Sequence, residues 1–169
     1  DAIVHVVRCF DDDDVIHVDS KIDPVSDAET INLELILSDM AQVEKRLERC
    51  AKDKKADPNE VAALAKVLKV LEEGLPARKA ALTDEEAAAT RGLGLLSAKK
   101  IIYAANVADS DLATGNERVE ALRKVAAQEG ANLVLVSAQV EAELAELSAE
   151  DRADFLSSLG VTLESSGLR

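Results

Sequence analysis

The chain has 169 residues, of which 47% are hydrophobic, 31% charged and only 2% aromatic, and its formal net charge is -13. This length suits one domain with or without an inserted piece, and the balance of apolar and charged residues excludes an intrinsically disordered chain. The acidic surface excludes general binding to nucleic acid or anionic membranes unless positive charge is concentrated locally, and no apolar run approaches the ~20 residues that span a bilayer.

The chain opens with a β-branched and almost uninterrupted apolar run, DAIVHVVRCF. Such a run is typical of a strand that is buried on both faces of a parallel sheet. His5 lies inside it, and we interpret this residue as a core histidine. Because the sequence starts within a strand and not with Met, we expect it to be a fragment of a longer protein.

A polar segment follows, DDDDVIHVDSKIDPVSDAE, and predicts a loop with a short extended piece at Val15 to Val18. The run from Asp11 to Asp14 predicts a solvated acidic loop and no metal site, because consecutive side chains do not converge on one ion without a specific turn. Ser26 or Asp27 is the predicted N-cap of the next helix.

Two heptad seams then predict a pair of packed helices, since their apolar residues recur at alternating spacings of three and four. The first seam consists of Leu33, Ile36, Met40, Val43, Leu47 and Cys50, and the second of Val61, Leu64, Leu68, Leu71 and Leu75. Asp57-Pro58-Asn59 separates the seams. We therefore predict an antiparallel coiled-coil hairpin, and we interpret both seams as packing because neither has a polar residue at its centre.

Positive charge gathers near the predicted tip of this hairpin, in KRLERCAKDKKA. Its cations are Lys45, Arg46, Arg49, Lys52, Lys54 and Lys55, set against Glu48 and Asp53. A solvated helix face is the simplest interpretation. Contact with an RNA backbone is the alternative.

The remainder alternates between strands and helices. A capping box of Thr83 and Glu86 begins a short helix, strands are predicted at Lys100–Ala105 and Asn132–Val136, and a helix at Asn116–Gln128. Two short helices follow, at Glu141–Leu147 and Ala149–Leu159. The predicted fold is therefore α/β, a partial Rossmann-like parallel sheet with an inserted hairpin. Its parts are residues 1–25 (strand and loop), 26–80 (hairpin) and 81–169 (second half of the sheet domain).

Two of the strands end in residues typical of a base-reading pocket, Asn106, Val107 and Asp109 after the first and Ser137 and Ala138 after the second. Because parallel sheets bind ligands at the carboxyl ends of their strands, these loops are predicted to meet. In P-loop GTPases the equivalent loops are Asn-Lys-x-Asp and Ser-Ala-Lys, whose Asp accepts hydrogen bonds from guanine. Alone, Asn-x-x-Asp is weak evidence because it often caps a helix, and Ser-Ala alone is weaker still.

The stretch HVVRCFDDDDVIHVDSKIDPVSDAETINLEL closely resembles the YchF branch of the Obg-like P-loop NTPases. IIYAANVAD and VLVSAQVEAELAEL also fit that family's fourth and fifth nucleotide motifs, so the resemblance runs through essentially the whole chain. It implies a P-loop NTPase fold with a coiled-coil insertion, hydrolysis of ATP with Mg, and a link to the ribosome and translation. The sequence departs from the family at Asp109, where Glu is usual, and this leaves GTP open.

The resemblance also indicates what this chain does not contain. No Gly is followed by Lys, so the phosphate-binding Gly-x4-Gly-Lys-Ser/Thr loop is absent from the sequence, and we expect the fragment alone to be inactive. A loop histidine matching His17 is the family's candidate for orienting the attacking water, although an exposed loop histidine is equally compatible with the sequence. A non-enzymatic hairpin module that binds a protein or RNA partner is the alternative function.

Cys9 and Cys50 lie far apart in the chain and suit a reducing cytosol, so we expect a cytoplasmic protein.

Overall fold

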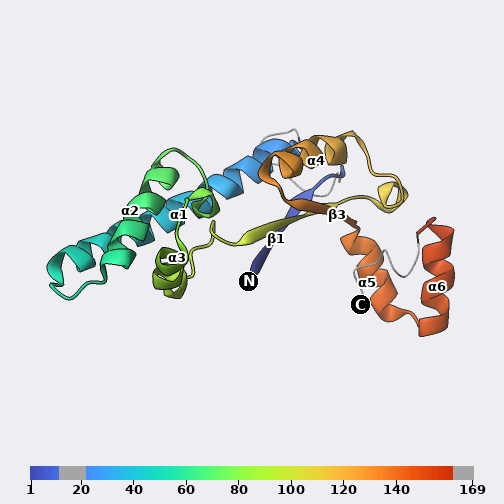
Figure 1. Ribbon diagram of the computed structural model, residues 1–169. Coiled ribbons are helices and arrows are strands. Elements are labelled where there is room, and N and C mark those ends of the chain that lie inside the picture. The colour runs from blue at the N-terminus through green and yellow to red at the C-terminus, as the bar shows by residue number, and fades with distance from the viewer. Residues whose placement is uncertain (12–21, 162–169) are drawn as a thin grey trace. The chain divides into compact units, whose positions relative to one another are not determined.

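The computed structural model describes residues 1–11 and 22–161. The chain divides into two compact units, each with its own hydrophobic cluster. The helical unit comprises Asp1–Ile3 and Glu29–Lys100, and the sheet unit comprises Val4–Ala28 and Ile101–Arg169. Figure 1 shows their elements in the order of the chain.

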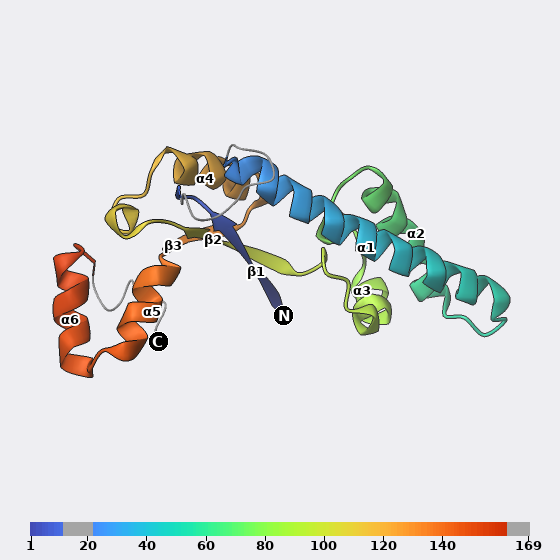
Figure 2. The ribbon, with the colours of Figure 1, turned by 180° about the vertical axis from the view of Figure 1, so that it is seen from behind.

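The sheet has three strands, β1 (Ala2–Arg8), β2 (Lys100–Asn106) and β3 (Asn132–Val136), in the order β1-β2-β3. β2 and β3 are parallel, with Ala105 opposite Leu135. Helix α4 (Glu117–Glu129) crosses over between them, capped by the Asn116 side chain and ended by Gly130 at a φ of 69° (Figure 2). The α/β class and the parallel sheet are therefore confirmed.

One face of this sheet remains open, which corrects the prediction that its strands are buried on both faces. Val4 and Val6 of β1 keep 60% and 62% of their surface exposed, and Val134 of β3 keeps 46%. His5 and Val7, which alternate with Val4 and Val6 along β1, are buried. The apolar composition therefore predicted the strands correctly. It did not predict their burial, because burial depends on what covers each face of the sheet.

The end of the sheet unit is a pair of short helices, α5 (Ala138–Glu146) and α6 (Ala149–Ser158). Val140, Leu144 and Leu156 form their common core. α5 begins three residues before the predicted Glu141, because Ser137 accepts a hydrogen bond from the Val140 amide and so caps the helix.

Helix α1 (Pro24–Lys52) also begins earlier than predicted. The side chain of Asp23 accepts hydrogen bonds from the amides of Val25 and Ser26, and Pro24 occupies the first helical position. Neither Ser26 nor Asp27 is therefore the N-cap. Proline suits the first turn of a helix because its missing N–H would be unpaired there in any case.

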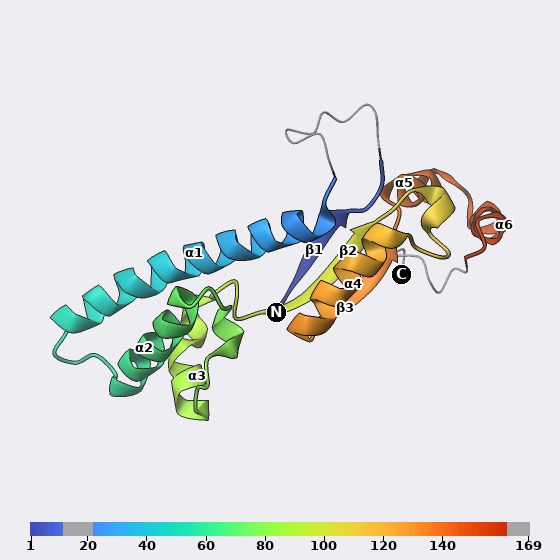
Figure 3. The same cartoon turned by 90° about the horizontal axis from the view of Figure 1, so that it is seen from above.

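In the helical unit, α1 packs against α2 (Pro58–Glu72), and a turn capped by Asp57 joins them (Figure 3). The central seam residues are buried together, whereas Leu33 and the outer residues Val61 and Leu75 are exposed. α2 also contacts α3 (Asp84–Thr90), which follows the short turn η1 (Ala77–Lys79) and leads into η2 (Arg91–Leu93). A third helix thus completes the packing, and the coiled-coil designation stays a prediction.

A buried carboxylate that no sequence pattern predicted fixes one side of this unit. Asp39 of α1 has no exposed surface. It accepts hydrogen bonds from the Leu96 amide at 2.8 Å and from the Ser97 amide and hydroxyl, both at 2.6 Å. Ser97 Oγ in turn accepts from the Ala77 amide at 2.9 Å. The chain before β2 is therefore tied to both α1 and η1.

Replacing Asp39 by Ala should lower the free energy of unfolding by about 3 kcal/mol, because buried donors lose their acceptor. Urea denaturation followed by circular dichroism measures this change. Ser38→Ala is the matched control, since Ser38 is the exposed neighbour on the same helix. Equal effects of the two substitutions would contradict a stabilising role for Asp39.

His5 is a buried titratable residue of the sheet unit. Its ring lies 5.3 Å from the Tyr103 ring, and its Nδ1 atom has no hydrogen-bond partner in the described part of the chain. Burial lowers the pKa of His5, with the Glu129 carboxylate acting in the opposite direction. The folded protein therefore disfavours the charged imidazole, whereas the unfolded chain takes up a proton near the ordinary histidine pKa of about 6.5.

We therefore expect stability to fall as the pH is lowered through about 6.5, because protons bind preferentially to the unfolded chain. His5→Phe keeps an aromatic ring against Tyr103 and should reduce this fall. Urea midpoints of both proteins at about pH 8 and about pH 5.5 provide the test. The same pH dependence in the variant would exclude His5 as its source.

Candidate functional site: the carboxyl edge of the sheet

The structure brings the two loops predicted to read a base together at one edge of the sheet. Asn106, the last residue of β2, lies opposite Val136, the last residue of β3. The chain continues from these residues into Val107–Asp109 and Ser137–Ala138. Parallel pairing places both loops at the same edge, as expected for a ligand site in an α/β sheet.

Three hydrogen bonds join the loops. Asn106 Oδ1 accepts from the Ala138 amide at 3.0 Å, and the Val107 amide donates to the Val136 carbonyl at 2.9 Å. The Ser137 hydroxyl donates to Asp109 Oδ1 at 3.1 Å. Since Ser137 also caps α5, its side chain fixes both the loop that contains Asp109 and the start of the following helix.

These bonds change what each predicted residue can offer to a ligand. The Val107 side chain is buried and its amide donates to the Val136 carbonyl of β3, so within the described part of the chain the Val107 carbonyl is the backbone group that could accept from a ligand. The Ala138 amide donates to Asn106 Oδ1 and is therefore already used within the protein. Asp109 is half-buried and uses one oxygen for Ser137, which leaves its second oxygen for another donor.

The end of β1 is attached to the same edge by Asn116, a residue predicted from the sequence only as the start of a helix. Its side-chain nitrogen donates to the Cys9 carbonyl at 2.8 Å and to Asp111 at 2.7 Å. The Cys9 amide donates to the Asn106 carbonyl at 2.7 Å. The loop after β2 and the exit of β1 are therefore held together by short polar contacts.

An exposed ion pair lies next to this junction. Both guanidinium nitrogens Nη1 and Nη2 of Arg118 donate to the Asp11 carboxylate, at 2.9 and 2.8 Å. This contact is the main cause that lowers the pKa of Asp11. Asp11 is thus committed to an arginine, which supports the interpretation of the acidic run as a surface loop at the one position that the structure describes.

The buried thiol of Cys9 is not activated as a nucleophile. Burial raises the pKa of Cys9 to about 11, with Arg118 opposing and Asp27 reinforcing the shift. The thiol of Cys9 is therefore protonated at neutral pH, and a thiol in that form is a poor nucleophile.

Within residues 1–11 and 22–161, no cluster of His, Cys, Asp and Glu could hold a metal ion. His17 lies outside the described residues.

The cationic cluster near the turn divides into two kinds of residue. Arg46 makes a bidentate ion pair with Glu60 of α2, at 2.7 and 2.9 Å, and so cross-links the two helices. The other cations are exposed: Lys45, Arg49 and Lys52 on α1, and Lys54 and Lys55 in the turn. The spacing of the three α1 cations places them on one face, opposite the packed seam.

Arg46 is therefore a structural residue, and the other five cations form an exposed basic face. The exposure of this basic face is compatible both with a solvated helix face and with contact to an RNA backbone. No helix in the part of the chain that the structure describes is long and apolar enough to cross a membrane.

Comparison with known proteins identifies relatives along nearly the whole chain, although no family model matches it. The chain is 45% identical to the ribosome-binding ATPase YchF of Bacillus subtilis, over 99% of the chain and 47% of that protein. It is 44% identical to the ribosome-binding ATPase YchF of Haemophilus ducreyi, over 95% of the chain and 45% of that protein.

A solved structure, that of the YchF GTPase of Schizosaccharomyces pombe, superposes with a TM-score of 0.80 at 31% identity, covering 96% of this chain and 46% of that one. The resemblance to the YchF family is thus confirmed, and the structural match supports a P-loop NTPase-like fold. The chain spans about half the length of the curated relatives it matches.

The bond between Ser137 and Asp109 can be tested by a double-mutant cycle with Ser137→Ala, Asp109→Ala and the double variant. We expect a coupling free energy of about 1 kcal/mol, because the two side chains share one hydrogen bond. Urea unfolding measures the four stabilities. Additive effects would show that the two loops are not joined through this bond.

Proposed function

We propose that this chain is the middle part of a YchF-type nucleotide-binding protein and supplies the base-reading half of its nucleotide pocket. The observation that carries this proposal is the pair of hydrogen bonds from Asn106 to Ala138 and from Ser137 to Asp109. They hold two loops in the order and at the sheet edge that a P-loop NTPase uses for the base. The homology to YchF proteins supports the same assignment.

The longer protein is proposed to bind and hydrolyse ATP, whereas this chain alone is not expected to turn over nucleotide. A phosphate cradle requires backbone N–H groups of a Gly-rich loop and a following Lys, and the sequence contains no Gly-Lys pair. No Mg is expected on this chain alone, and in the longer protein it would accompany the bound nucleotide. Hydrolysis, with His17 as the candidate for orienting water, would depend on the phosphate-binding half.

ATP is the preferred nucleotide in this proposal, and GTP is the alternative. The Val107 carbonyl is suited to accept a hydrogen bond from the exocyclic amine of adenine. The second oxygen of Asp109 would instead accept from N1–H of guanine, and it would be repelled by N1 of adenine, which is itself an acceptor. The named relatives divide in the same way, since the bacterial proteins are called ATPases and the yeast structure a GTPase.

A role on the ribosome is proposed for the helical unit. The relatives are named ribosome-binding proteins, and the exposed basic face (Lys45, Arg49, Lys52, Lys54 and Lys55) is a local exception on a chain with a net charge of -13. Phosphate contacts need such a concentration of cations. A non-enzymatic hairpin module remains the second candidate function, because this face does not depend on a nucleotide.

Nucleotide binding should require the phosphate-binding half. Fluorescent ATP and GTP analogues with Mg are titrated into this chain and into a longer protein that adds roughly 100 upstream residues. We expect only the longer protein to bind, with a preference for ATP. Absence of binding to a folded longer protein would refute the nucleotide proposal.

Asp109→Asn in that longer protein separates the two bases. It should weaken GTP binding by about tenfold and change ATP binding by less than about twofold, because only guanine uses the carboxylate as an acceptor. Glu146→Gln, at an exposed position on α5, is the control. A large loss of ATP binding in Asp109→Asn would contradict recognition through the Val107 carbonyl.

Reversing the charge of the basic face should weaken ribosome binding. Lys45→Glu, Arg49→Glu and Lys52→Glu are combined in one variant, and cosedimentation with ribosomes is measured over a range of salt concentrations. We expect weaker binding and a shallower salt dependence, by roughly one unit of slope for each phosphate that the variant no longer neutralises. Lys124→Glu, on the exposed side of α4, should have little effect, and equal weakening in both variants would argue against a localised site.

A further inference from the structure

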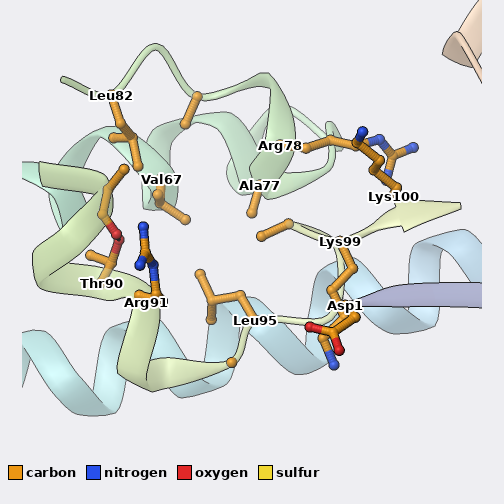
Figure 4. A pocket seen from close by; sticks show the side chains of 14 residues that line it. Asp1, Val67, Ala77, Arg78, Leu82, Thr90, Arg91, Leu95, Lys99 and Lys100 are labelled. Carbon is orange, nitrogen blue, oxygen red and sulfur yellow. The ribbon is translucent and has the colours of Figure 1, made fainter. Parts of the chain in front are cut away.

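A hollow in the helical unit has no role in the proposed nucleotide site. It has a volume of about 680 Å³ and lies between α2, η1, α3 and the segment that leads into β2 (Figure 4). Its floor is apolar and consists mainly of small side chains, with Val67, Ala77 and Leu95 buried at its centre. A volume of this size is typical of a ligand site.

Cationic side chains surround this apolar floor. Arg91 extends into the hollow from one end, and Arg78, Lys99 and Lys100 gather at the other end (Figure 4). Arg78 Nη1 also donates to the Ser97 carbonyl at 3.3 Å. Asp1 supplies the one carboxylate among the described residues that line the hollow, so the rim is positive on a chain that is acidic overall.

Polar contacts between residues that do not line the hollow hold its walls. The Asp39–Ser97 network holds the segment before β2. On the opposite wall, Lys66 of α2 makes an ion pair with Glu86 of α3, with both oxygens at 2.7 Å. The hollow is therefore preformed, and a ligand would not have to order its walls.

We propose that this hollow binds an acidic amphipathic helix of a protein partner. Apolar side chains at i, i+3, i+4 and i+7 would fill the floor, and flanking Asp or Glu residues would face the cations at both ends. The alanines at positions 77, 80, 87 and 98 allow a helix backbone to approach closely. An RNA strand would use the cations but would leave the apolar floor in water, so the combination favours a peptide. This inference does not depend on the proposed nucleotide function.

The test uses the full chain and a fluorescein-labelled model peptide of about 16 residues, built from Leu at the stated spacing with Glu and Ala elsewhere. A second peptide carries Lys in place of each Glu. Fluorescence anisotropy measures affinity, and amide shifts of the 15N-labelled chain locate the contact. We expect binding of the Glu peptide alone, with shifts concentrated in residues 77–100.

Two pairs of variants test the site itself. Ala87→Trp fills the hollow and should weaken binding by about tenfold, whereas Ala88→Trp, the neighbouring exposed residue outside the hollow, should leave it within about twofold. Arg91→Glu should weaken binding, and Lys124→Glu should not. Circular dichroism verifies that each variant is folded.

Several outcomes would overturn the proposal. Equal binding of the Lys peptide would remove the charge argument, and equal effects of the two Trp variants would remove the site. Shifts in residues 77–100 on addition of oligouridine but not of the Glu peptide would assign the hollow to RNA. Shifts that depend on the concentration of the chain alone would assign it to a second copy.

Discussion

The parallel pairing of β2 with β3 is the constraint on which the nucleotide proposal depends. It sets Asn106 opposite Val136, so that the residues after both strands leave the sheet at one edge. Side-chain hydrogen bonds then fix the loops that the pairing has brought together. A shift of one residue in this register would turn Asn106 to the other face and separate it from Ala138.

The helical unit is organised by different interactions. Its apolar seam supplies the bulk of the packing, and buried charges determine how the surrounding segments attach. Glu60 pairs with Arg46 across the two long helices, and Asp39 collects the donors of the segment before β2. Each of these carboxylates has its hydrogen-bond partners, which is the condition under which buried charge is tolerated. The five cations of the exposed basic face lie on the surface of this unit, and they are the residues proposed to contact the ribosome.

Local patterns predicted most elements, and long-range contacts account for what they missed. The strands, the helix capped by Asn116 and the capping box at Thr83 follow from hydrophobic periodicity and short-range hydrogen bonding. Asp39 was missed because its carboxylate serves donors more than fifty residues away, at Leu96 and Ser97. The exposed faces of Val4 and Val134 were missed because composition shows that a strand is apolar but not what covers it.

The central claim is that the edge formed by Asn106, Val107 and Ala138 reads a nucleotide base. The most direct measurement is the change in the amide resonances of Val107 and Ala138 when ATP and then GTP are added to the longer, phosphate-binding protein. Recognition through this edge predicts shifts at both amides with ATP and smaller shifts with GTP. Tight nucleotide binding that leaves both resonances unchanged would contradict the claim and place the base elsewhere.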